Sequence, residues 1–137
     1  MLKINRADCQ PFLTKDGSEI RELMAWRNSP AKRQSLAEAS LPPGGKTTCH
    51  RHQLTEEIYY FLAGSGLTLA GDDFFRVGPG DAVLNRPGVR HQTWNLADTT
   101  LVFLCCCSPA YEHDDTLLLP EATPPPELAS SGGSQHA

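Results

Sequence analysis

Apolar and polar residues alternate over short stretches along most of this chain, and turns rich in glycine and proline separate these stretches. Short runs with this period are typical of β-strands, because successive side chains of a strand point to opposite faces. The last such run is the most apolar in the chain, and a strand there is predicted to be buried on both faces. Strands are predicted at residues 35–41, 67–70, 74–77, 82–85, 89–96 and 99–107. The pattern indicates an all-β fold.

The N-terminal part is less regular. A short strand is predicted at Leu2–Asn5. In residues 18–26 the apolar positions have helical spacing, but turn sequences at Asp16-Gly17 and at residues 28–30 bound a run of strand length. We therefore predict a strand over residues 18–26.

The C-terminal part changes in composition. Leu117, Leu118 and Leu119 are expected to pack against the rest of the domain. From residue 120 onward the chain is rich in proline, serine and glycine and has almost no apolar residues to bury. We predict a single domain over residues 1–119 and a disordered tail over residues 120–137.

Length and charge limit the classes of function. A chain of 137 residues is long enough for one domain with a sizeable core. It has 12 lysines and arginines against 16 aspartates and glutamates, a formal net charge of −4, and no basic run, so no nucleic-acid partner is expected. The N-terminus lacks the apolar core of a signal peptide, and no apolar run approaches the roughly 20 residues of a membrane span. We expect a cytoplasmic protein with no membrane partner.

Candidate chemistry is concentrated near the middle of the chain. His50 and His52 lie two residues apart, so in a strand both imidazoles point to the same face. A carboxylate follows at Glu56 or Glu57, and a third imidazole is available at His91. Imidazoles and a carboxylate that meet at one point are typical ligands of a divalent transition metal. In an unbroken strand Glu56 would share the histidine face, whereas a turn at residues 53–55 would bring Glu57 to that face.

These residues resemble the two motifs of the cupin superfamily. The first motif, G-x5-H-x-H-x(3,4)-E-x6-G, is matched by Gly44, His50, His52, Glu57 and Gly64. The second motif, G-x5-P-x-G-x2-H-x3-N, is matched by Gly80, Gly88, His91 and Asn95, with Arg86 where the family usually has proline. The resemblance covers residues 35–108. It implies one jelly-roll barrel, a double-stranded β-helix, that holds one metal ion through His50, His52, Glu57 and His91, and it favours Glu57 over Glu56.

Aromatic residues near the motifs differ in their expected positions. On the same face as Glu57, Tyr59 would place a phenol beside the metal, where it could donate or accept a proton. Tyr60, Phe61 and Phe75 are expected in the core. Trp94 would point to the face opposite His91, outward or against another subunit.

Three of the five cysteines are consecutive, which is a poor disulfide framework and fits a reducing compartment. In a strand, Cys105 and Cys107 share one face and Cys106 points to the other. Either face of this strand could line a cavity.

The resemblance does not imply a single reaction, because barrels of this type support many chemistries. We predict a metal-dependent enzyme that acts on a small oxygen-bearing molecule, with dioxygenase chemistry favoured. A non-redox isomerase, cyclase or lyase, or a non-catalytic binding protein, is the alternative. The ligand set suits Fe, Mn, Ni or Zn. A homodimer formed through the N-terminal strands is expected, because small barrels otherwise expose sheet edges.

Overall fold

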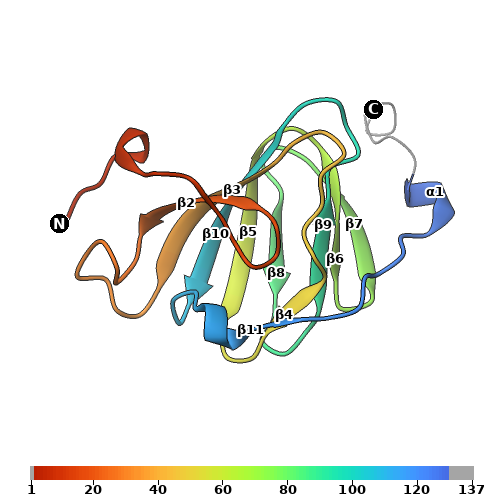
Figure 1. Cartoon of the computed structure of the whole chain (residues 1–137). Coiled ribbons are helices and arrows are strands. Elements are labelled where there is room, and N and C mark those ends of the chain that lie inside the picture. The colour runs from red at the N-terminus through yellow and green to blue at the C-terminus, as the bar shows by residue number, and fades with distance from the viewer. Residues whose placement is uncertain (1, 130–137) are drawn as a thin grey trace.

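The computed structural model describes residues 2–129. Its strands form two antiparallel sheets that face each other (Figure 1). The six-stranded sheet has the order β1-β2-β3-β10-β5-β8, and the five-stranded sheet has the order β11-β4-β9-β6-β7. The strands are β1 (Phe12–Leu13), β2 (Glu19–Met24), β3 (Ser35–Leu41), β4 (His50–His52), β5 (Glu56–Ala63), β6 (Gly66–Ala70), β7 (Asp73–Val77), β8 (Ala82–Asn85), β9 (His91–Trp94), β10 (Leu101–Ser108) and β11 (Thr116–Leu118). This is a jelly-roll barrel, as the sequence predicted.

Helical structure in the described residues consists of η1 (Arg6–Asp8), η2 (His113–Asp115) and α1 (Pro126–Ala129). None of these helices is long and apolar enough to cross a membrane. The N-terminal prediction was wrong, because no strand forms at Leu2–Asn5. Instead the Asn5 side chain accepts a hydrogen bond from the backbone N–H of Ala7 and caps η1. The strand predicted within residues 18–26 is present as β2.

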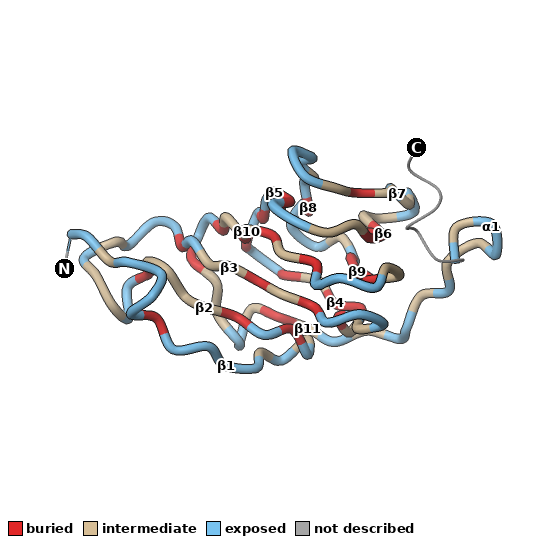
Figure 2. The backbone as a smooth tube through the Cα atoms, turned by 90° about the horizontal axis from the view of Figure 1, so that it is seen from above, coloured by how far each residue is buried: buried red, intermediate tan, exposed pale blue. Residues whose placement is uncertain are grey.

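The core lies between the two sheets, and β10 runs through its centre. This strand pairs with β3 on one side and β5 on the other. Its buried and half-buried residues alternate, as they do along the tube in Figure 2. The prediction of a strand buried on both faces was therefore wrong, because only one face of β10 packs into the core. The buried cluster consists of Ile20, Ala39, Leu41, Tyr59, Phe61, Val77, Leu101, Phe103 and Cys105.

Two aromatic residues expected in the core are exposed. Tyr60 is 42% exposed and Phe75 is 44% exposed, whereas Phe61 is fully buried as predicted. Tyr60 is exposed because side chains alternate along β5, and the buried positions of this strand are Glu57, Tyr59 and Phe61.

The residues after β11 run along the outside of the five-stranded sheet (Figure 1). Ala122 and Leu128 pack against a buried cluster of Leu67, Leu69 and Trp94. Trp94 does point away from the His91 face, but the chain's own C-terminal segment covers it rather than a second subunit. Ala122 and Leu128 of the predicted tail therefore contact the barrel, and residues 130–137 lie outside the described residues.

Candidate metal centre

The four predicted ligand residues come from both sheets and meet in the barrel interior. His50 and His52 lie on β4, and His50 pairs with His91 of the neighbouring β9. Glu57 reaches the same place from β5 in the opposite sheet. One potential ligand atom from each of the four residues lies within 4.8 Å of the others, and all four residues are buried.

A turn between β4 and β5 decides which glutamate faces the histidines. The backbone N–H groups of Leu54 and Thr55 donate to the Asp115 carboxylate, at 2.8 and 3.0 Å. This turn breaks the alternation between the two strands, as the sequence predicted. As a result Glu57 is buried beside the histidines and Glu56 is exposed.

Hydrogen bonds determine which ring nitrogen of His50 and of His52 carries a proton. His50 Nδ1 lies 2.7 Å from the Thr48 carbonyl oxygen, which can only accept, so Nδ1 is the donor. His52 Nδ1 lies 3.1 Å from the Thr116 hydroxyl, whose own proton is donated to a backbone carbonyl, so this Nδ1 is also the donor. In the neutral imidazole, Nε2 of each ring therefore presents a lone pair.

Two of the imidazoles, those of His52 and His91, lie beside the Glu57 carboxylate. Glu57 Oε1 lies 3.3 Å from both His52 Nε2 and His91 Nε2, and all three atoms are buried without a hydrogen-bond partner among the described residues. Burial lowers the pKa of His50 to about 4, with the neighbouring His91 acting in the same direction, so this imidazole is neutral at pH 7. Converging acceptor atoms of this kind fit a bound divalent cation.

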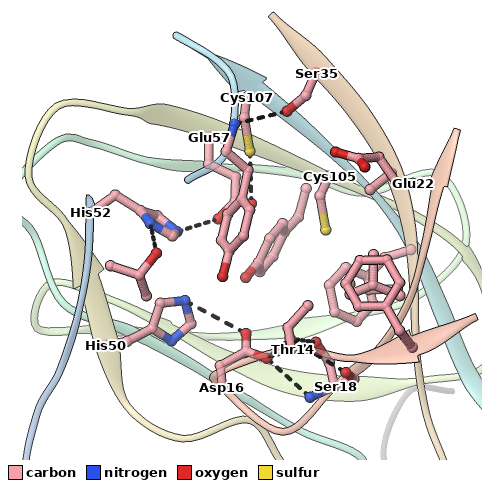
Figure 3. Close-up of a pocket in the computed structure, with 18 residues that line it drawn as sticks. Thr14, Asp16, Ser18, Glu22, Ser35, His50, His52, Glu57, Cys105 and Cys107 are labelled. Carbon is pink, nitrogen blue, oxygen red and sulfur yellow. Dashed lines mark hydrogen bonds and ion pairs between the residues drawn. The ribbon is translucent and has the colours of Figure 1, made fainter. Parts of the chain in front are cut away.

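Two cysteines line the cavity beside this cluster. The Cys107 thiol donates to Glu57 Oε2 at 3.1 Å, which leaves Oε1 directed at the histidines (Figure 3). Cys105 lines the same cavity, whereas Cys106 is half-buried on the other face of β10. Burial and the nearby Glu57 charge raise the pKa of both Cys105 and Cys107, so these thiols are protonated.

Tyr59 also lines the cavity. Its ring is 2% exposed and lies 5.8 Å from the His91 ring and 4.7 Å from Phe103, measured between ring centroids. Burial and the Glu57 charge raise the pKa of Tyr59 well above its usual value, so the phenol keeps its proton. Its hydroxyl is therefore suited to donating a hydrogen bond rather than to accepting a proton as a phenolate.

Sequence reasoning missed a second carboxylate in the cavity. Asp16, in the turn between β1 and β2, places Oδ2 3.6 Å from His50 Nε2. Its only signal in the sequence was the Asp-Gly turn, which gives no indication that the hairpin folds over the barrel. The Asn85 side chain is also buried and has no hydrogen-bond partner among the described residues, and Asn85 pairs with Glu57 between β8 and β5.

Other residues of the two motifs serve the fold. The Asn95 amide donates to the backbone carbonyls of Leu41 and Thr99. Arg86 is exposed and is not among the residues that line the cavity. His113, which lies outside both motifs, is exposed.

The fold and the cluster together define a class of jelly-roll barrels with imidazoles and a carboxylate directed into one end of the barrel. Comparison with known proteins agrees, because the cupin domain family matches residues 37–107. The chain belongs to the cupin family.

Similar proteins match a larger part of the chain than the family match does. The uncharacterized protein MJ1618 of Methanocaldococcus jannaschii is 41% identical over 105 residues, which cover 77% of this chain and 84% of that protein. An oxalate-binding protein of Thermotoga maritima is 30% identical over 86 residues, 63% of this chain and 71% of that protein. The solved structure of the polyketide cyclase RemF from Streptomyces resistomycificus has a TM-score of 0.75 at 24% identity, and the match covers 89% of this chain and 87% of that one.

Proposed function

We propose that this protein is a metal-dependent enzyme that acts on a small oxygen-bearing molecule, with dioxygenase chemistry favoured. The observation that carries the proposal is the convergence of acceptor atoms in a buried site, where Glu57 Oε1 lies 3.3 Å from two imidazole nitrogens. Three imidazoles and one carboxylate suit Fe, Mn, Ni or Zn. Such an ion supplies Lewis acidity and, if it is redox-active, access to O2 chemistry.

The chain's own residues would perform the remaining steps. His50, His52, Glu57 and His91 would hold the ion. Tyr59, whose burial keeps its phenol protonated, would donate a hydrogen bond or a proton to a substrate oxygen. The apolar cavity walls would exclude water from the substrate. In the intact protein, Tyr59→Phe is expected to lower turnover and leave the metal content unchanged.

Non-redox chemistry of the cyclase, isomerase or lyase class is the second candidate. The protonated phenol of Tyr59 favours it, because these reactions need proton transfer and no redox-active metal. RemF, a barrel of the same fold, is a polyketide cyclase. A third candidate is a non-catalytic binding protein, as the name of the Thermotoga relative indicates for that protein.

Oxygen uptake distinguishes these candidates. Protein loaded with Fe(II) or Zn(II) is supplied with catechols and diketones in an oxygen electrode. Oxygen uptake that requires both Fe(II) and an organic substrate supports the dioxygenase. Conversion of a substrate by the zinc form without oxygen uptake supports the second candidate, and binding without conversion in either form supports the third.

We also propose a cytoplasmic homodimer. All five cysteines are unpaired, which suits a reducing compartment. The outer face of the six-stranded sheet carries a row of apolar side chains that are 36–48% exposed: Leu36, Ile58, Tyr60, Leu62 and Leu84. A second copy of the chain would cover this face, which differs from the N-terminal strands that the sequence suggested as the interface.

A further inference from the structure

The N-terminal hairpin forms one wall of the cavity. Every second residue from Phe12 to Glu22 lines it, which is the period expected for strands that present one face to the interior. The other walls are largely apolar and include Ala37, Ala39 and Phe103. The interior space that the centre of a water-sized molecule can reach is about 50 Å³. The lining suits a ligand with an apolar body.

Asp16 is held so that one carboxylate oxygen remains available to the cavity. Oδ1 accepts three hydrogen bonds, from the Thr14 hydroxyl and from both the backbone N–H and the hydroxyl of Ser18. Oδ2 faces His50 Nε2 at 3.6 Å. Figure 3 shows Asp16 on the His50 side of the cavity, across from Glu57. An acceptor therefore lies next to the proposed metal site, on the side opposite Glu57.

Within residues 2–129, no lysine or arginine forms an ion pair with the Asp16 carboxylate, which lies beside the His50 imidazole. Among the described residues, those that line the cavity include neither lysine nor arginine. Arg27 pairs with Glu22 at 3.0 Å and with Glu112 at 2.9 Å. Lys15 donates to the backbone carbonyl of Thr116 at 2.9 Å. Both of these basic groups are thus bonded to partners other than Asp16.

A divalent ion in this site would be balanced by the two carboxylates of Asp16 and Glu57. An anionic ligand would then add charge that nothing in the cavity compensates, whereas a ligand hydroxyl would supply the proton that Asp16 Oδ2 can accept. We propose that the cavity selects an uncharged ligand with an apolar body and adjacent hydroxyl groups, such as a catechol or an enediol, and discriminates against dicarboxylates through Asp16. This inference rests on the proposed function, because it presupposes the metal site.

The test compares two probes that each present oxygens on neighbouring carbons. Catechol is uncharged at pH 7 and oxalate is a dianion, and binding of each to the zinc-loaded full chain is measured by titration calorimetry. The variant is Asp16→Asn, because asparagine keeps an Oδ1 that can accept the bonds from Thr14 and Ser18. The control is Asp72→Asn, which makes the same change of charge at a side chain that is 97% exposed.

We expect wild-type protein to bind catechol more tightly than oxalate. In Asp16→Asn the ratio of the two dissociation constants should shift toward oxalate by roughly tenfold, which corresponds to about 1.4 kcal/mol. The control should keep the wild-type ratio. Zinc retained together with an unchanged ratio in Asp16→Asn, or an equal shift in the control, would overturn this inference alone. Failure of the wild-type chain to hold zinc would overturn the proposed function and this inference with it.

Discussion

At the scale of single residues, His50, His52 and Glu57 each use one polar atom for a hydrogen bond within the protein. The other polar atom of each side chain faces the cavity. A backbone carbonyl and a threonine hydroxyl hold Nδ1 of His50 and His52, so that Nε2 of each ring points inward. The Cys107 thiol holds Oε2 of Glu57 and leaves Oε1 for the histidines. Partners of this kind orient metal ligands and contribute to metal affinity.

Replacing Cys107 tests this orientation. Cys107→Ala removes the donor to Glu57 Oε2, so we expect zinc affinity to fall by about 10- to 100-fold in competition with a chromophoric chelator. Cys107→Ser keeps a donor and should stay close to wild type. Equal affinity of Cys107→Ala and wild type would show that the thiol only fills space.

The pKa of His50 predicts how the metal-free protein responds to acid. In the folded state it is lowered to about 4, from 6.5 in a free imidazole. Between these values the unfolded chain binds a proton that the folded chain does not, so stability is lost as the pH falls. We expect the unfolding free energy in urea to drop by about 2 kcal/mol from pH 7 to about pH 4.5 through this group.

The variant His50→Gln removes this proton uptake and should lose correspondingly less stability over the same range. An identical pH dependence in both proteins would contradict the assignment to His50.

The motifs predicted which histidines and which glutamate come together, because their spacing reflects the geometry of neighbouring strands. Asp16 could not be predicted in the same way. Its position beside His50 depends on how the β1–β2 hairpin folds over the barrel, which no local pattern in residues 12–24 encodes.

At the scale of elements, the turns decide what faces the cavity. Asp115 holds the turn before β5 from 60 residues away in sequence, a contact that periodicity cannot reveal. The strands at residues 35–41 and 82–85 were predicted with the observed bounds, since turn residues flank each of them. The strand predicted at Leu2–Asn5 does not form, and no described strand of either sheet pairs with these residues.

Gly64 ends the strand that carries Glu57, and it is required there for two reasons. Its φ is +83°, and a Cβ would lie 2.5 Å from the Thr100 carbonyl oxygen. Gly80 has a φ of +93° but no atom within 4 Å of a Cβ, so Gly80→Ala measures the backbone cost alone, about 1–2 kcal/mol. We expect Gly64→Ala to lower the unfolding free energy by at least about 3 kcal/mol in a urea titration. If both variants lost the same unfolding free energy, the backbone at Thr100 and Leu101 would have to move away from the new Cβ at no cost in free energy.

At the scale of the whole molecule, the exposed apolar row on β5 and its neighbours predicts association. Tyr60→Glu places a charge in the middle of this row and should convert a dimer to a monomer in sedimentation equilibrium. Leu54→Glu makes a comparable change at a loop residue that is 72% exposed, and it should leave the dimer intact. A wild-type monomer at the highest concentration reached would contradict the proposed dimer.

The central claim is that the four converging residues bind a metal, and metal content tests it most directly. Wild-type protein, His52→Leu and His113→Leu are purified without chelator or nickel resin, and metal per chain is measured by inductively coupled plasma mass spectrometry. The second histidine is exposed and lies outside the cluster. We predict about one divalent transition-metal ion per chain in wild type and His113→Leu, and far less in His52→Leu. Absence of metal from the wild type after reconstitution, or full occupancy in His52→Leu, would contradict the account.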